Sequence, residues 1–340
     1  SVAGKGGFGK GSTWFYRPRK YSASGTLAKD RGRHYMKFGL AYRHSYGTSV
    51  NPNLMNWIFS PNYTANTFIS PNTLLSGDSW ATFLLGAIDN SSNANFKTPQ
   101  NIIRDQWGLF FQDDFKLNRN LTLNLGLRYE YETAPVEELD RMSRYLDLTN
   151  PIPEMQAAPP QMPGAATAIR TAAPIYNGAW VFTDENNRAL YRAPKTIFLP
   201  RVGIAYRLND KSALRIGYAR YAIPMVNAIG SSWYVPVDGY NATSNPLPSV
   251  EGIPNARFSN PFPAESNPLI PSAGKSWGRY TNLGQGAVWF QQDMKAGMND
   301  RLNVTLQLEL PTGIRADITY FYAYTHHHQA PNIWGGTGTV

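Results

Sequence analysis

The segment from Leu121 to Glu132, LTLNLGLRYEYE, alternates between apolar and polar side chains over twelve residues. Leucine and tyrosine occupy the odd positions, and threonine, asparagine, glycine, arginine and glutamate occupy the even ones. A period of two is typical of a β-strand with one apolar face and one polar face. The apolar face must meet either a protein core or lipid, and the interpretation of the whole chain depends on which.

Four pairs of strand-like segments are each joined by a short polar turn. The hairpins are expected near residues 21–46, 105–132, 198–223 and 302–324. The turn sequences DRGR, KLNRN, NDK and PTG contain the Gly, Asn, Asp and Pro residues that tight turns prefer. The sequence therefore predicts an all-β, antiparallel chain.

The connections between the hairpins are much longer. Residues 47–104, 134–197 and 224–301 are rich in Asn, Ser and Pro and mostly lack a strand period. Of the 25 prolines, eight lie in 134–197 and nine in 224–301, which argues against regular β-ladders there. Loops of this length are uncommon in compact soluble domains, whereas outer-membrane β-barrels combine short periplasmic turns with long extracellular loops. We therefore predict a segment of an antiparallel transmembrane β-barrel, with its apolar parity facing lipid.

Parity assigns the side chains of each strand to two faces. The expected lipid-facing residues are Leu121, Leu123, Leu125, Leu127, Met36, Phe38, Leu40, Val304, Leu306 and Leu308. Tyrosines near strand ends share this parity, as an interfacial girdle requires, although aromatic residues are also good strand formers. These tyrosines are Tyr129, Tyr131, Tyr218, Tyr320, Tyr322 and Tyr324. The charged residues Arg128, Glu130, Lys37 and Arg43 fall on the opposite parity, which would face the lumen.

The formal net charge of +9 suggests nucleic acid as a partner, but no run of five basic residues occurs. The densest basic cluster, between Arg17 and Arg33, is expected to form a solvated rim, which would also suit anionic lipopolysaccharide. We expect no nucleic-acid partner. No stretch approaches the roughly 18 apolar residues of a transmembrane helix. The absence of cysteine excludes disulfides and thiolate metal sites.

Several segments carry a family resemblance. The segment WGLFFQDDFKLNRNLTLNLGLRYEYETAPVE is similar to part of the TonB-dependent outer-membrane receptors. The segments FLPRVGIAYRLNDKSALRIGYARY, GDSWATFLLGA and LNVTLQLELPTGIRADITYFYAY resemble further parts of the same family. The subgroup they resemble comprises large receptors with an N-terminal carboxypeptidase-regulatory-like domain, abundant in acidobacteria.

The resemblance implies a barrel of about 22 strands closed by a plug, located in the bacterial outer membrane. Such a receptor imports a scarce or bulky ligand with energy transduced by TonB. Eight or nine strands are expected in this chain, and no plug domain, so residues 1–340 are expected to be an internal part of one barrel domain. TonB would then act through a plug outside the chain. One alternative is an outer-membrane surface-binding or adhesion protein that displays its loops on a barrel. A soluble domain that binds an anionic polymer is a further alternative.

Enzymatic activity is not expected. The carboxylate runs Asp113-Asp114 and Glu137-Glu138 invite a catalytic interpretation, but neighbours on a strand point to opposite faces. No nucleophile-elbow, zinc-protease or EF-hand spacing occurs. The glycine-rich GKGGFG neither follows a strand nor opens a helix, so we interpret it as a turn and expect no cofactor.

Two groups of residues remain as candidate binding sites. His326 and His328, from the run HHH, could chelate a metal, but a solvated loop start is the preferred interpretation. Trp180, Trp233, Tyr234 and Trp277 lie in the long loops among polar residues. Aromatic rings beside amides suit capture of a glycan, peptide or siderophore, whereas the alternative is that they anchor the loops to one another.

Overall fold

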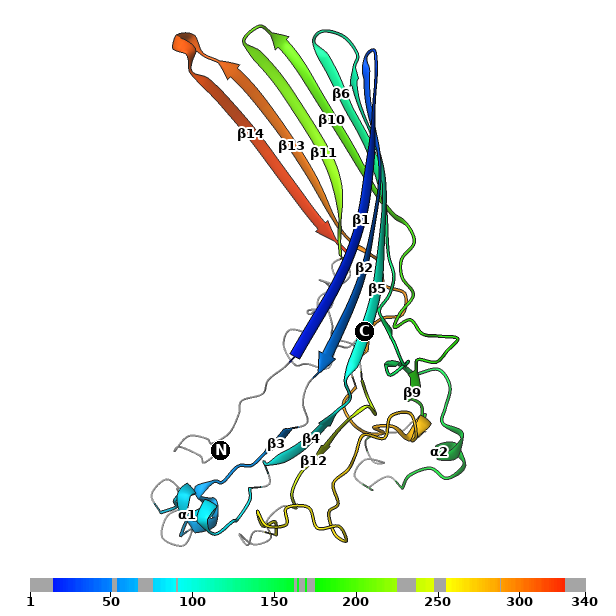
Figure 1. Ribbon diagram of the computed structural model, residues 1–340, viewed down its shortest axis with the longest axis vertical. Helices are drawn as coiled ribbons and strands as arrows, with labels where there is room; N and C mark the ends of the chain where they lie inside the picture. Colours follow the sequence, from blue (N-terminus) through cyan, green and yellow to red (C-terminus); the bar gives the residue numbers. More distant parts are fainter. Residues whose placement is uncertain are drawn as a thin grey trace.

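A computed structural model describes residues 15–50, 54–66, 76–89, 91–161, 164, 169, 175–224, 237–247, 255–287 and 289–327. A nine-stranded antiparallel sheet dominates it, accompanied by one three-stranded and one two-stranded sheet. Figure 1 shows the large sheet as a tall curved wall with short turns at one end and long connections at the other. We call this sheet the wall, and its two ends the turn end and the loop end.

The wall is built from consecutive hairpins. Its order is β1 (Phe15–Arg31), β2 (His34–Val50), β5 (Gln100–Lys116), β6 (Leu121–Glu132), β10 (Ile197–Asn209), β11 (Ser212–Ile223), β13 (Gly297–Glu309) and β14 (Arg315–His326). A ninth, short strand, β7 (Val136–Glu137), pairs with the loop end of β5. Every pairing is antiparallel, which fits the fold class that the sequence predicts.

Each hairpin overlaps a segment in which the sequence predicts one, but the strands run further toward the loop end. The first strand begins at Phe15 rather than near residue 21, and its partner continues to Val50. β5 begins at Gln100, so both ends of the expected loop 47–104 belong to strands. The reason is that the ladder between β2 and β5 keeps one register over its whole length, whether or not the side chains alternate in polarity.

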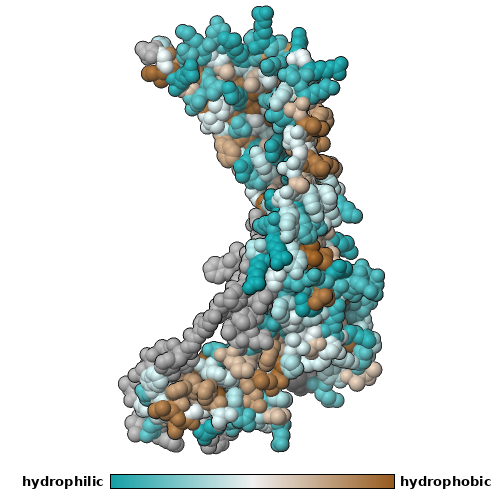
Figure 2. Space-filling model, viewed as in Figure 1, coloured by the Kyte–Doolittle hydropathy of each residue, from teal (hydrophilic) through white to brown (hydrophobic). Residues whose placement is uncertain are grey.

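Cross-strand pairing aligns the apolar residues into rows, because directly opposed residues share a face of the sheet. Leu27 lies opposite Phe38, Phe38 opposite Phe111, and Phe111 opposite Leu127. These four side chains are 39–76% exposed, so no protein core covers them. We call this side of the wall the apolar face and the other the polar face. The exposure contradicts a soluble sandwich and fits the predicted lipid-facing parity. Figure 2 shows mostly hydrophilic residues over the turn end and groups of hydrophobic ones at the right-hand edge of the wall beneath.

An aromatic row borders the apolar face toward the loop end. Tyr42 lies opposite Trp107, which lies opposite Tyr131, and the first two rings have centroids 4.2 Å apart. On β14 the predicted girdle tyrosines Tyr320, Tyr322 and Tyr324 are at least half exposed. Interfacial aromatic residues of a barrel have this placement.

The long connections form a second layer below the loop end, which we call the loop layer (Figure 1). It contains the strands β3 (Leu54–Asn56), β4 (Asn93–Lys97), β8 (Ser143–Asp147), β9 (Ala179–Phe182) and β12 (Asn241–Ser244). Its helices are α1 (Ser79–Leu84) and α2 (Pro153–Ala157), with short 3-10 turns at Pro61–Thr64 and Gly278–Tyr280, while a third, Pro311–Gly313, lies in the β13–β14 turn. No helix in the described ranges is long and apolar enough to cross a membrane.

The main hydrophobic core lies where the loop layer meets the wall, not between two sheets. Its buried members are Ile102, Ala134, Met142, Leu190, Tyr191 and Met294. They come from the base of β5 and from two of the long connections, which therefore pack against each other. The described parts of these connections thus pack into a core, which their lack of strand period did not predict.

Candidate functional site

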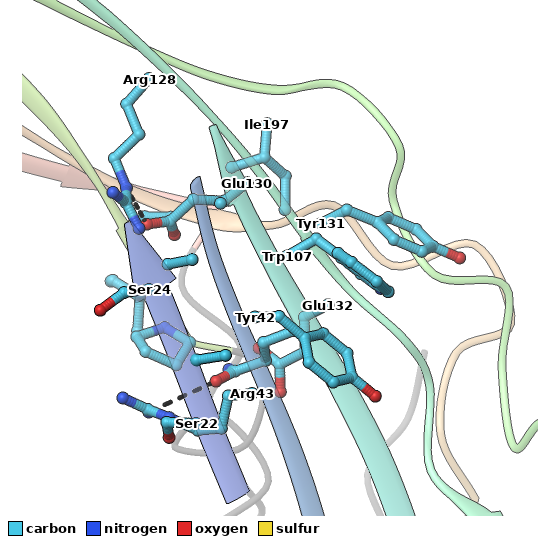
Figure 3. A pocket seen from close by; sticks show the side chains of 17 residues that line it. Ser22, Ser24, Tyr42, Arg43, Trp107, Arg128, Glu130, Tyr131, Glu132 and Ile197 are labelled. Carbon is cyan, nitrogen blue, oxygen red and sulfur yellow. Dashed lines mark hydrogen bonds and ion pairs between the residues drawn. The ribbon is translucent and has the colours of Figure 1, made fainter. Parts of the chain in front are cut away.

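A cavity of about 420 Å³ lies on the polar face, in the part of the wall nearer the loop end. Its polar lining includes Ser24, Arg43, Gln106, Arg128, Glu130 and Glu132. They come from β1, β2, β5 and β6, four strands that are neighbours in the sheet. Figure 3 shows the side chains of Tyr42, Trp107 and Tyr131 pointing to the opposite side from Arg128 and Glu130.

Local pairing positions the charged groups of this cavity. Arg128 Nε donates to Glu130 Oε1 at 2.5 Å, and Arg43 Nη1 lies 3.4 Å from Gln106 Oε1 (Figure 3). Arg128 also lies over Gly108, where a Cβ atom would stand 2.6 Å from the guanidinium. Glycine at that position therefore makes room for the arginine. The predicted lumenal parity of Arg128, Glu130 and Arg43 agrees with this arrangement.

The lower part of the cavity adjoins buried charged groups. Glu132, from the end of β6, is 8% exposed, and Arg104, from β5, is 4% exposed. Burial raises the pKa of the nearby Tyr191 hydroxyl, while Arg104 lowers it and Glu132 raises it by smaller amounts. The phenol therefore stays neutral. The cavity offers hydrogen-bond donors and acceptors, and both positive and negative side chains, which suits binding of a polar group.

Glu137 organises the loop layer beside this cavity. Its carboxylate is fully buried and accepts hydrogen bonds from Arg141 Nη2 at 2.6 Å and from the backbone amides of Leu139 and Arg141, each at 2.9 Å. Burial raises the pKa of Glu137, but these hydrogen bonds outweigh it and hold the pKa below the usual value. Arg188 donates to Asp140 Oδ1 and to the Glu137 carbonyl oxygen. The group is an ionised structural anchor, unsuited to acid catalysis.

The two carboxylates of the other run, Asp113-Asp114, lie on opposite faces of the wall. Asp113 and Asp114 lie within β5, near its turn end, and their partners differ. Asp113 Oδ2 is 2.7 Å from His34 Nδ1 on the apolar face, whereas Asp114 accepts from Gln112 on the polar face. The two carboxylates therefore do not share a site.

The candidate metal ligands are only partly described. His326 ends β14, with Nε2 3.2 Å from Asp300 Oδ2 and Nδ1 3.1 Å from His327 Nδ1. His328 lies outside the described residues. Within the described part of the chain no group of three or more His, Cys, Asp or Glu side chains could hold a metal ion. A site using His326 and His328 stays a prediction.

The four candidate aromatic residues do not form one site among the described residues. Trp180 in β9 is only 5% exposed, so the expectation of an exposed stacking ring is wrong there. Its indole packs inside the loop layer, because a large apolar ring is more stable away from water. Trp277 is 50% exposed. Trp233 and Tyr234 lie outside the described residues.

Sequence reasoning missed the anchor of Glu137, Arg141 and Arg188. The spacing of four residues between Glu137 and Arg141 was an available signal, but it is common and weak. Arg188 lies 51 residues from Glu137 and carried no local signal.

Comparison with known proteins points to one family. The sequence profile of a family described as outer membrane beta barrel domain matches residues 1–333. None of the curated proteins compared with the chain matches it significantly. Solved structures with a similar arrangement include the outer membrane transporter YddB of Escherichia coli, at 13% identity and a TM-score of 0.45, over 92% of this chain and 26% of YddB.

Two further similar structures are described as receptors. The ferric-catecholate import receptor Fiu of E. coli K12 has 11% identity and a TM-score of 0.36, over 92% of this chain and 32% of Fiu. The alcaligin outer membrane receptor FauA of Bordetella pertussis has 12% identity and a TM-score of 0.29, over 94% of this chain and 41% of FauA. The chain thus spans less than half the length of each.

Proposed function

Because the chain belongs to the outer membrane beta barrel domain family, we propose that it forms part of the wall of a TonB-dependent receptor in the bacterial outer membrane. The observation that carries the proposal is the division of the wall into an exposed apolar face and a charged polar face with a cavity. A protein that only displays its loops at the cell surface would not require a charged cavity on the polar face. A protein that takes up a ligand through the lumen of a barrel would require one.

Among the described residues the wall is open, with β1 and β14 at its two edges. Exposed edges of long strands invite association with other strands, and barrels remove them by closure. We propose that residues 1–340 are one part of a single barrel domain. Further strands and a plug domain outside this chain would complete the receptor, and TonB would act on the plug.

Lipid and lipopolysaccharide are the proposed partners of the outer surface. Arg17 and Arg19 share the apolar-face parity of Tyr21 and lie nearer the loop end than it does. Both are exposed. With the loop end outside the cell, these guanidinium groups would lie at headgroup level, where the phosphates of lipopolysaccharide are natural partners.

The proposed ligand is a siderophore, a glycan or a peptide that is too scarce or too bulky for passive entry. It would be captured by the loops, since strands are constrained by pairing and lipid. Trp277 is the described candidate with an exposed ring. Replacing it by Ala should weaken ligand binding by about 1 kcal/mol or more if its ring stacks on the ligand.

Uptake by the source bacterium tests the function. A strain that lacks the gene should fail to grow on one particular nutrient or iron source when single sources are compared. Uptake of that source by the wild type should stop when an uncoupler removes the proton gradient, because TonB transmits that energy. Surface binding that persists without any energy-dependent uptake would favour the adhesion protein instead.

A further inference from the structure

Two arginines and a tyrosine form a stacked group on the polar face, next to the cavity described above. The Arg201 guanidinium lies 5.3 Å from the centroid of the Tyr221 ring, and that of Arg301 lies 4.9 Å from the same centroid. Arg201 and Arg301 both lie opposite Ala219, on strands that flank β11 from either side. Two strand spacings separate their Cα atoms, which is about 10 Å.

The stacking prepares both arginines for binding. A guanidinium that rests on an aromatic ring uses its flat face, and its N–H donors remain available around its edge. Arg301 Nε donates to Asn299 Oδ1 at 2.6 Å, which is a neutral partner. Tyr221 is 38% exposed, and both guanidinium groups are on exposed residues.

Toward the turn end, a third arginine, Arg215, lies on the same face of β11 and is also exposed. Carboxylates lie near Arg215, since Asp210, Glu309 and Asp317 line the same cavity as this arginine, but none of them forms an ion pair with it. Between Tyr221 and Arg215, the neighbouring positions of β10, β11 and β13 on the polar face are Gly203, Ala205, Gly217, Ala219, Asn303 and Thr305. All are small or uncharged. Among the described residues no carboxylate forms an ion pair with Arg201, Arg215 or Arg301.

We propose that Arg201, Arg301 and Arg215, with Tyr221 as the positioning residue, bind the anionic groups of the imported ligand on the lumenal side of the wall. The inference rests on the proposed function and narrows it to ligands that carry at least two carboxylates or phosphates. Arginine matches such oxyanions in a two-point fork, and two forks held at one tyrosine ring fit a ligand that carries more than one anionic group. A neutral glycan would leave three cations without a partner.

Anion binding to the complete receptor, purified in detergent, tests the site. The probes are citrate and inorganic pyrophosphate, with maltotriose as a neutral control, titrated by calorimetry at low salt. We expect one of the anions to bind, maltotriose not to bind, and the affinity to fall as sodium chloride is added. The double variant Arg201→Gln/Arg301→Gln should bind that anion at least tenfold more weakly.

Matched variants separate a binding role from a structural one. Arg207→Gln removes an arginine of the same strand that is already paired with Asp210, and should leave binding unchanged. Tyr221→Leu should weaken binding severalfold because it removes the ring, whereas Tyr221→Phe, which keeps the ring, should restore it. A wild-type receptor that binds neither anion would overturn the proposal, and so would equal affinities in Arg201→Gln/Arg301→Gln and the wild type.

Labelling identifies what covers the arginines. Phenylglyoxal should modify Arg201 and Arg301 in the complete receptor, and citrate or pyrophosphate should protect them. If both are unreactive before any anion is added, a protein segment occupies the site and the ligand proposal is wrong. These measurements do not depend on transport. Anion binding without energy-dependent uptake would therefore contradict only the proposed function.

Discussion

Glu137 is buried without losing its charge, because one guanidinium and several backbone amides surround its carboxylate. Replacing Glu137 by Gln should destabilise the loop layer by about 2 kcal/mol, since hydrogen bonds to a charged group are lost. The rate of hydrogen exchange at the amides of Leu139 and Arg141 in the full-length protein measures this loss of stability. The lowered pKa means that the stabilisation is complete above the usual value of 4.5 and is lost only as pH falls through the lower pKa of the folded state.

The neighbouring Glu138 is a control for this prediction. It is exposed and accepts from Tyr46 and Asn101 at the surface. Glu138→Gln should therefore change exchange much less. Equal effects of the two substitutions, or loss of protection already at pH 5 in the wild type, would contradict the anchoring role of Glu137.

At the scale of the strand, the apolar face is bounded by two histidines of β2. His34 pairs with Asp113 near the turn end, and His44 with Asp105 near the loop end. Ten residues span about 34 Å along a strand, and at the usual tilt this is about 25 Å of height, the thickness of the apolar band of a barrel. The row that contains Leu127 lies between these limits.

Leu127→Arg should therefore place a charge in the hydrocarbon region and destabilise the protein by about 2–4 kcal/mol. The measurement is the urea midpoint of reversible folding of the full-length protein into phospholipid vesicles. Thr122→Arg, on the polar face of the same strand, should cost far less. If both variants fold equally well, Leu127 does not face lipid.

On the scale of the whole molecule, the described part of the curved wall has β1 and β14 at its edges, and the proposed receptor would close these edges with further strands. Removing the β13–β14 hairpin from the full-length protein should abolish the heat-dependent shift in gel mobility that closed barrels show. Removing α2 (Pro153–Ala157), in the loop layer, should leave the shift in place. A hairpin deletion that keeps the shift would mean that the barrel closes without this part of the wall.

Parity and turn chemistry were sufficient to predict the hairpins and their two faces, because the direction of a strand side chain depends only on the local backbone. Leu125, Leu127 and the tyrosines of β14 lie on the face that alternation assigns to them. The placement of Arg128 and Glu130 on the polar face, opposite to the apolar side chains, followed from the same rule. Strand ends were less predictable, because pairing continues where polarity no longer alternates, as in β2 beyond Tyr46.

Contacts between distant segments could not be read from local pattern. The burial of Trp180 depends on which loops pack over it, and the anchor at Glu137 needs Arg188 from another part of the loop layer. Arg201 and Arg301 meet at Tyr221 only because three strands lie side by side in one particular register. Alternation decides the face on which a side chain lies, whereas its neighbours on that face depend on strand order and register, which arise when the whole sheet assembles.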